Sequence, residues 1–183
     1  MPPKPPSDTA MRVSTLDQTA PTPFALRPDS AQCRDIAESM DLLALRKLSF
    51  TGDVAASGSA DWQMTGRLGA TVVQPCSVTL APVTTRIDAT VCRLYQRDFV
   101  AVDAPEAEMP EDDTTEALGA WIDPGTVMIE AISIAAPDFP RKDGAELGEM
   151  VYSKPGIKAM TDEDARPFAG LADLKQKLEN GEN

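Results

Sequence analysis

The sequence has no histidine and only three cysteines, and both shortages restrict the chemistry that it can perform. Without histidine it lacks the usual general base, the commonest imidazole metal ligand and the usual partner of a nucleophilic serine or cysteine. Cys33, Cys76 and Cys92 form no Cys-x-x-Cys pair, and their odd number argues against a disulfide framework. We therefore expect reduced thiols, and we predict a protein that is not an enzyme and needs no metal ion or cofactor.

Long apolar runs are missing too, and aromatic residues make up only 5% of the chain. No stretch approaches the roughly 18 apolar residues typical of a membrane span, and residues 1–6 lack the apolar core of a secretory signal. The chain nevertheless has 183 residues, 42% of them hydrophobic, which is enough for a domain with a buried core. We expect a cytoplasmic protein without a membrane partner.

Positive charge is scarce in the second part of the chain. The net charge is −12; residues 1–100 hold ten Lys or Arg and ten Asp or Glu, whereas residues 101–183 hold seven against nineteen. Phosphate contacts normally supply much of the affinity for nucleic acids, so the acidic part would repel a polyanion. Extensive direct binding to RNA and a DNA partner are not expected.

Sequence periodicity predicts the first elements. Residues 1–20 combine proline, serine, threonine and charge with few apolar side chains, which is typical of a disordered leader. A short extended segment at residues 24–26 precedes a helix that runs to about residue 43, with Asp29 or Ser30 as its N-cap. Cys33 lies one turn before Ala37 on that helix, so we interpret it as a small buried side chain.

The period changes at Leu45, after which apolar and polar residues alternate. Residues 45–52 and 62–72 predict a hairpin with its turn at residues 55–59. Two prolines bracket a corner within residues 72–83. The chain then returns with one face made of Val83, Thr85, Ile87, Ala89, Val91, Arg93 and Tyr95. We expect three or four successive antiparallel strands.

The remaining segments are less regular. Residues 103–116 hold seven acidic residues and no basic one, which indicates a solvated loop or, as the alternative, a partner-binding segment. Residues 124–136 are predicted as a helix capped by Asp123, with a buried strand as the alternative. Residues 166–179 have the apolar stripe of a short helix that docks on the body or on a partner.

These elements predict an α+β fold: an antiparallel β-sheet or partial barrel with two or three packed helices. The expected organisation is a disordered leader at residues 1–20, a domain at 21–145 and a polar C-terminal extension at 146–183 that ends in the short helix.

Two groups of residues are candidates for chemistry. Cys76 could act only with a base, a strong positive field or further metal ligands nearby, and its proline and valine neighbours supply none of these, which favours a structural thiol. The basic residues of the predicted sheet are either scattered solubilising charge or, if they align, a modest anion patch. The candidates for that patch are Arg46, Lys47, Arg67, Arg86 and Arg93, with Arg97 nearby.

The segment from Gln74 to Val83, QPCSVTLAPV, resembles the signature of the YceD family, bacterial proteins named for large ribosomal RNA subunit accumulation. The acidic middle and the later WIDPG and PDFPR segments are also similar, so the resemblance runs from about residue 45 to residue 144. Many members have a second cysteine in the signature and another near the end of the domain. Here Val73 takes the paired position and residues 141–143 contain no cysteine, so a metal-binding role is not implied.

The resemblance implies ribosome biogenesis, by support of the synthesis, processing or stability of large-subunit rRNA. The acidic charge suits contact with a basic ribosomal protein or assembly factor of the large-subunit pre-ribosome. The alternatives are a direct rRNA-binding module that uses the sheet arginines, and a small enzyme that depends on an exposed Cys76 of lowered pKa. The family-motif or interaction candidates are Gln74, Pro75, Cys76, Thr79, Pro82, Trp121, Asp123 and Glu130.

Overall fold

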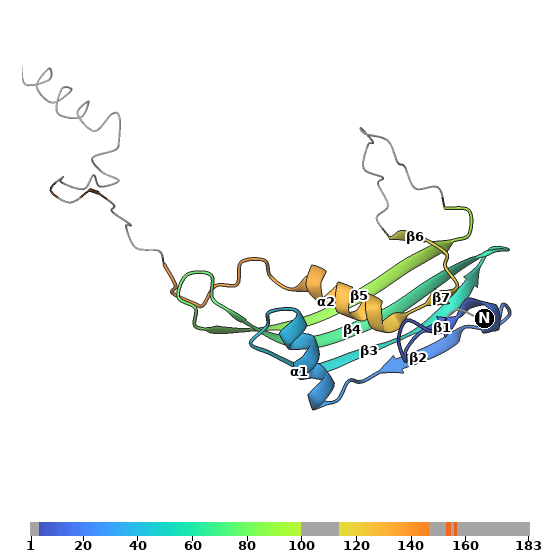
Figure 1. Ribbon diagram of the computed structural model, residues 1–183, viewed down its shortest axis with the longest axis horizontal. Coiled ribbons are helices and arrows are strands. Elements are labelled where there is room, and N and C mark those ends of the chain that lie inside the picture. Colours follow the sequence, from blue (N-terminus) through green and yellow to red (C-terminus); the bar gives the residue numbers. More distant parts are fainter. Residues whose placement is uncertain (1–3, 100–113, 147–152, 155, 157–183) are drawn as a thin grey trace, which may run out of the picture. The chain divides into compact units, whose positions relative to one another are not determined.

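The computed structural model describes residues 4–99, 114–146, 153–154 and 156 (Figure 1). The chain divides into two compact units, Met1–Lys142 and Asp143–Asn183. Every helix and strand described below belongs to the first unit. The predicted helix at residues 166–179 and most of the acidic segment at 103–116 lie outside the described residues.

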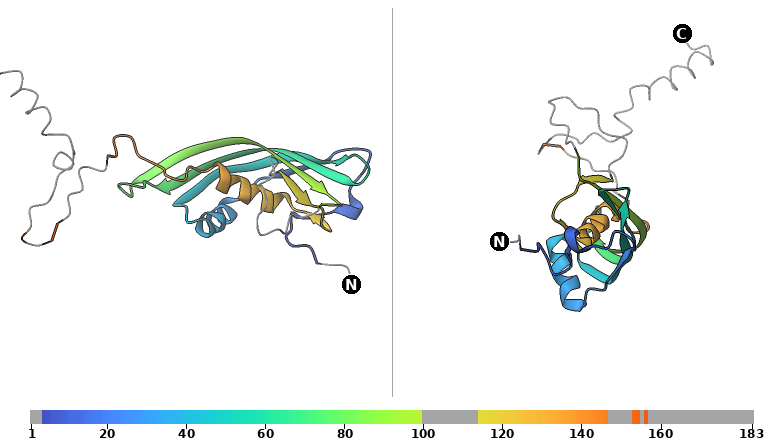
Figure 2. Two further views of the ribbon diagram at one scale, coloured as in Figure 1. Left: turned by 90° about the horizontal axis from the view of Figure 1, so that it is seen from above. Right: turned by 90° about the vertical axis from the view of Figure 1, so that its right-hand side faces the viewer.

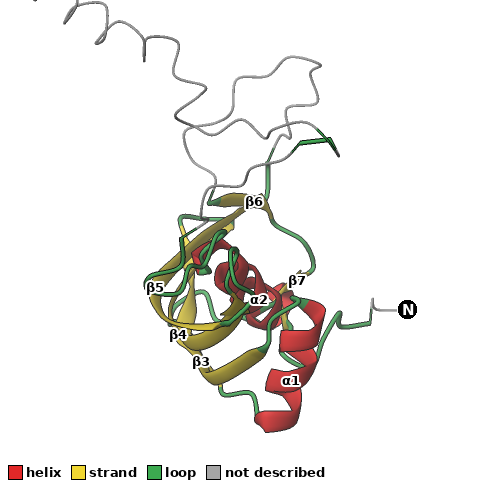
Figure 3. Cartoon of the chain, turned by 90° about the vertical axis from the view of Figure 1, so that its left-hand side faces the viewer, coloured by secondary structure: helices red, strands yellow, loops and turns green. Residues whose placement is uncertain are grey.

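A five-stranded sheet forms the body of the first unit, in the order β2-β3-β4-β5-β6. The three central strands are long and antiparallel, and β6 is parallel to β5. The sheet curves around the helices but stays open, with β2 and β6 at its edges (Figures 2 and 3). This confirms the predicted α+β class. The strand bounds are β2 Thr22–Leu26, β3 Ala44–Ser57, β4 Asp61–Pro75, β5 Pro82–Gln96 and β6 Thr115–Ala117.

Alternation of side chains gives this sheet one apolar face, here called the inner face. Buried side chains such as Phe50, Met64 and Ile87 lie on it. The rings of Phe24 and Phe50 meet with centroids 5.0 Å apart. Gly66 makes room for them, because a Cβ at that position would lie 2.6 Å from Phe50 Cε2.

Two helices cover the inner face. Helix α1 (Ser30–Ser39) begins at Asp29, whose carboxylate accepts hydrogen bonds from the N–H groups of Ala31 and Gln32. It packs against β3 and buries Cys33, as predicted. The helix ends at Ser39, earlier than expected, and the chain turns where Asp41 takes a left-handed φ of 53°.

Helix α2 (Pro124–Ala135) packs against β4 and β5, which excludes the alternative of a strand. Asp123 caps its start, with Pro124 in the first turn, as predicted. Its apolar residues are not all buried: Ile129 is 36% exposed and Ile134 is 71% exposed. No helix among the described residues is long and apolar enough to cross a membrane.

The predicted disordered leader differs from the structure between Ser7 and Leu16. Strand β1 (Met11–Arg12) pairs with β7 (Trp121–Ile122), and the short 3-10 helix η1 (Val13–Thr15) follows it. Met11, Val13 and Leu16 pack against the core. These few apolar residues follow no helical or strand period, so their burial could not be inferred from local pattern. Residues 1–3 lie outside the described range.

Two smaller differences concern the sheet. The predicted turn at residues 55–59 is shorter, because β3 continues to Ser57 and β4 begins at Asp61. The predicted acidic loop ends in a strand: Thr115 and Glu116 pair with Leu94 and Tyr95 as part of β6. Short parallel edge strands carry too few residues for a period-2 signal.

Candidate interaction surfaces

The signature residues form a tight loop between β4 and β5. Pro75 and Pro82 face each other as the last pair of the two strands, and the N–H of Cys76 donates to the carbonyl of Ala81 at 2.8 Å. The N–H of Leu80 donates back to the carbonyl of Cys76 at 2.9 Å, with Leu80 at a φ of 60°. The side chains of Thr79 and Leu80 are exposed at the tip.

A second segment that carries the resemblance, residues 137–141, lies against this loop. The carbonyl of Pro140 accepts hydrogen bonds from the N–H of Ser77 at 2.8 Å and from its hydroxyl at 3.2 Å. The Gln74 side chain donates from Nε2 to the carbonyl of Pro137 at 3.1 Å. Two segments that lie 63 residues apart in the sequence are therefore joined by hydrogen bonds into one cluster.

Cys76 lies at the centre of that cluster and has no exposed surface. Its Sγ accepts from the backbone N–H groups of Val78 and Thr79 at 3.5 Å and from that of Lys142 at 3.4 Å. Hydrogen bonds from the Thr79 hydroxyl and from these N–H groups lower the pKa of Cys76 to about 6, against the opposing effect of burial. In the fold this sulfur therefore acts as the acceptor for three backbone N–H groups that come from two segments.

The described residues contain no cluster of three or more His, Cys, Asp or Glu side chains that could hold a metal ion. Cys33 is buried on α1, and burial raises its pKa. Cys92 is partly exposed and accepts a hydrogen bond from Gln63 Nε2 at 3.4 Å. The three thiols therefore occupy separate sites.

Asp123 joins the start of α2 to the N-terminal segment. Its carboxylate accepts hydrogen bonds from Ser7 Oγ at 2.7 Å, from Thr126 Oγ1 at 3.0 Å, from the N–H of Gly125 at 2.9 Å and from the Thr9 hydroxyl. Burial alone would raise the pKa of Asp123, but these hydrogen bonds together outweigh it and lower the pKa below its ordinary value. Trp121 lies nearby in β7, half-buried. Asp123 thus joins the N-terminal segment to the first turn of α2.

Glu130 and Arg93 form an ion pair on the inner face. Arg93 Nη2 lies 2.7 Å from Glu130 Oε1 on α2, and its Nε lies 3.0 Å from Glu116 Oε1 on β6. The Arg93 side chain is only 11% exposed. The pair ties β5 to a helix and to an edge strand, and it separates Arg93 from the other candidates for an anion patch.

Those other candidates lie on the opposite, outer face of the sheet. Arg46 of β3 and Arg86 of β5 both flank Thr71 of β4, so they are two strand spacings apart, about 10 Å. Arg67 lies on β4, four residues before Thr71 and on the same face, about 13 Å along the strand. Arg86 pairs with Asp88, with Nε 2.9 Å from Oδ2, whereas Arg67 and Arg46 make no ion pair with any described residue. We call Arg46, Lys47, Arg67 and Arg86 the basic outer face.

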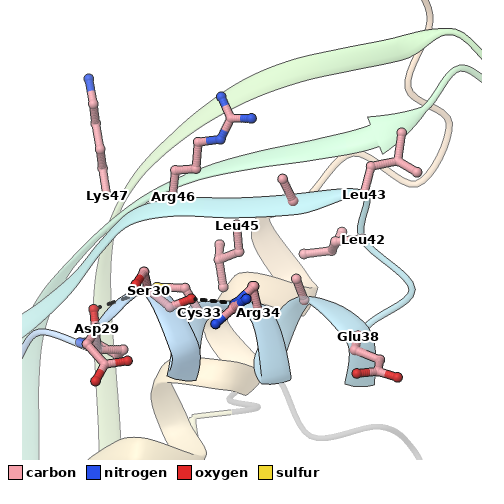
Figure 4. A pocket seen from close by; sticks show the side chains of 13 residues that line it. Asp29, Ser30, Cys33, Arg34, Glu38, Leu42, Leu43, Leu45, Arg46 and Lys47 are labelled. Atoms are coloured by element: carbon pink, nitrogen blue, oxygen red, sulfur yellow. Dashed lines mark hydrogen bonds between the residues drawn. The ribbon is translucent and has the colours of Figure 1, made fainter.

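A β-bulge adds Lys47 to this face. Arg46 pairs with Thr71 and Ser49 with Gly69, so β3 has one extra residue between the two pairs, where Lys47 takes a φ of 50°. The bulge lets Leu45 and Leu48 both be buried. Figure 4 shows Arg46 and Lys47 pointing away from α1 while Leu45 points toward it. The alternating pattern gave no signal of this extra residue.

The side of the molecule formed by the helices has the opposite charge. Four acidic residues lie on or beside α1, opposed there by Arg27 and Arg34, and α2 contains no Lys or Arg. The acidic residues are Asp29, Asp35, Glu38 and Asp41, and each is exposed. Sequence reasoning assigned the acidic character to the second part of the chain and missed this contribution from α1.

An open, curved sheet with two helices on its inner face and opposite charge on its two sides defines a small α+β domain without an evident catalytic centre among the described residues. The family model described as large ribosomal RNA subunit accumulation protein YceD matches residues 64–175, more than half of the chain. The protein therefore belongs to the YceD family, as the resemblance predicted, and the family name connects it with accumulation of large-subunit rRNA. No curated protein and no solved structure matches the chain.

The match begins within β4, so the basic residues of β3 and all of α1 lie outside it. Arg67 and Arg86 lie inside it, as do the signature loop and α2. The basic outer face therefore combines residues from the matched segment with two, Arg46 and Lys47, from the part of the chain that precedes it.

Proposed function

We propose that this protein is a non-enzymatic ribosome-biogenesis factor that supports the synthesis, processing or stability of large-subunit rRNA through contact with a basic ribosomal protein or assembly factor. Family membership supports the connection with rRNA. The observation that carries the mode of action is the exposed acidic charge around α1, beside a helix α2 without basic residues. Complementary charge speeds encounter with a basic partner and disfavours acidic ones.

Burial of Cys76 argues against the alternative of a thiol-dependent enzyme. The lowered pKa would suit a nucleophile, but a nucleophile must reach its substrate and this sulfur has no exposed surface. The N–H groups that lower the pKa also enclose the sulfur, so one geometry accounts for both properties.

A second candidate function is direct contact with rRNA, and the basic outer face favours it. Arg46, Lys47 and Arg67 are exposed, lie on adjacent strands and face the same side of the sheet. Exposed cationic side chains that share one polar face of a sheet can contact several phosphates of one strand. The net charge of −12 of the whole chain opposes contact with a polyanion, so we rank this function second.

The test is a pull-down of the tagged full-length chain from its native cells at low and at moderate salt, with and without nuclease. We expect large-subunit precursor particles at low salt and a basic protein contact that survives nuclease. RNA recovered without protein, and lost in a variant with Arg46, Lys47 and Arg67 all changed to Gln, would replace protein contact by direct RNA binding. Modification or cleavage of rRNA by the purified protein alone would refute the non-enzymatic proposal.

A further inference from the structure

We propose that the groove between α1 and α2 is the docking site for a basic, amphipathic helical segment of a partner protein. The inference rests on the proposed function in taking the partner to be a basic protein, and it adds where and by what chemistry that partner binds.

The groove exists because the two helices pack on different strands. Helix α1 contacts β3, whereas α2 contacts β4 and β5, and both lie on the inner side of the sheet (Figures 1 and 3). The groove consists of two open cavities of about 460 and 480 Å³, and Ile129 lines both of them. The first is bounded by Asp123 and Leu26, and the second reaches Gln74 of the signature segment.

Each helix presents a stripe of side chains to the groove at helical spacing. Helix α1 contributes Gln32, Asp35, Ile36 and Ser39, and Met40 follows at its end. Helix α2 contributes Met128, Ile129 and Ser133. Ile36 and Met40 are partly buried and Ile129 is 36% exposed, so apolar surface remains open to a third element. A groove with apolar side chains on two sides is the surface into which an amphipathic helix packs its own apolar stripe.

The charge of the groove selects the partner. Among the described residues that line it, Asp35, Asp123 and Asp138 are acidic, and Arg27 is the one basic side chain. Asp35 and Asp138 are exposed and make no ion pair with any described residue. An occupant with apolar residues on one side and Lys or Arg on the flanks would satisfy both the apolar floor and the acidic rim. RNA would meet repulsion here, in contrast with the basic outer face.

The experiment uses the full-length chain and, as probe, a fluorescent peptide of about 18 lysines and leucines with leucine at helical spacing. A scrambled peptide of the same composition is the control for amphipathicity, and a single-stranded RNA oligonucleotide is the control for class of ligand. Binding is measured by anisotropy, and the site by NMR shift mapping. Each variant is first checked for an unchanged unfolding midpoint.

The variants come in matched pairs. Ile129→Glu should weaken binding of the helical probe about tenfold or more, whereas Ile134→Glu, on the same helix but outside the groove, should change it by about twofold or less. Asp35→Lys should weaken binding about threefold to tenfold at low salt. Glu38 lies on the same helix but lines a different cavity, so Glu38→Lys should weaken binding less.

Equal weakening by both members of a pair, equal binding of the scrambled peptide, or groove shifts caused by RNA would overturn the inference. Large-subunit rRNA is measured in parallel in cells that carry Ile129→Glu as their only copy. If the variant loses the probe but the rRNA level is normal, the groove stands as a binding site and its part in the proposed function fails. If the probe binds Ile129→Glu normally, the groove inference fails whatever the rRNA level.

Discussion

The two faces of the long antiparallel sheet are built from the same three strands but perform different tasks. The inner face buries Phe50, Met64 and Ile87 beneath two helices, and its one arginine, Arg93, is held by Glu130 and Glu116. The outer face leaves Arg46 and Arg67 exposed among threonines, without an ion pair to a described residue. Substitutions on the two faces should therefore separate stability from binding.

The sharpest test of this separation is the pair Phe50→Ala and Thr51→Ala, neighbours on opposite faces of β3. Phe50 has no exposed surface, so its truncation should lower the free energy of unfolding by about 3–5 kcal/mol. Thr51 faces outward, and its change should cost about 0.5 kcal/mol or less. Urea denaturation measures both. Similar losses of unfolding free energy at the two positions would show that the outer face also contributes to stability.

Arg93 on the inner face and Arg67 on the outer face should differ in the same way, with a smaller difference in stability. Arg93→Ala removes a partly buried ion pair and leaves Glu130 without its partner, which should cost about 1–2 kcal/mol of unfolding free energy. Arg67→Ala should leave stability within about 0.5 kcal/mol of the parent protein. The comparison would break if Arg67→Ala were the more destabilising of the two in the same denaturation series.

A further test concerns the pH dependence of the stability that Cys76 contributes. Its folded pKa of about 6 lies below the ordinary 9.0, so the folded state releases this proton more readily than the unfolded state. The stabilisation from the thiolate is fully present above pH 9, declines as the pH falls and is lost below about 6. The stability difference between the parent protein and Cys76→Ala should therefore grow from pH 6 to pH 9.

Alkylation of the native protein supplies the control for this prediction. Cys92 is partly exposed and should react first with iodoacetamide, whereas buried Cys76 should react only when the protein unfolds. A stability difference that stays flat across the pH range would contradict the hydrogen-bonded thiolate. Rapid alkylation of native Cys76 would contradict its burial and revive the thiol-dependent enzyme.

The features that local sequence predicts well are those decided by near neighbours. Asp29 and Asp123 cap their helices within three residues of chain; the sequence predicts Asp123, and it predicts Asp29 with Ser30 as the alternative. Alternation along β5 places Arg93 beside Val91 and Tyr95, and all three are buried. The same alternation places Arg86 on the other face, so the sequence already contained the reason to separate Arg93 from the anion-patch candidates.

The features that it missed depend on distant segments. Ser7 meets Asp123 across 116 residues, and the N–H of Lys142 reaches Cys76 across 66. Lys47 joins the basic outer face only because a bulge adds one residue to β3 opposite β4. No local period records these contacts, because each depends on how the whole sheet and its helices pack.

By itself the sequence determined the α+β class, the caps, the alternation of the long strands and the membership of the YceD family, because each follows from residue types at short spacing or from a contiguous motif. Only the tertiary structure decided that Cys76 is enclosed, that the charges segregate to opposite sides of the sheet and that a groove separates the helices. The physical reason is that burial and the distance between charges are properties of packed surfaces, which form when segments far apart in the chain come together.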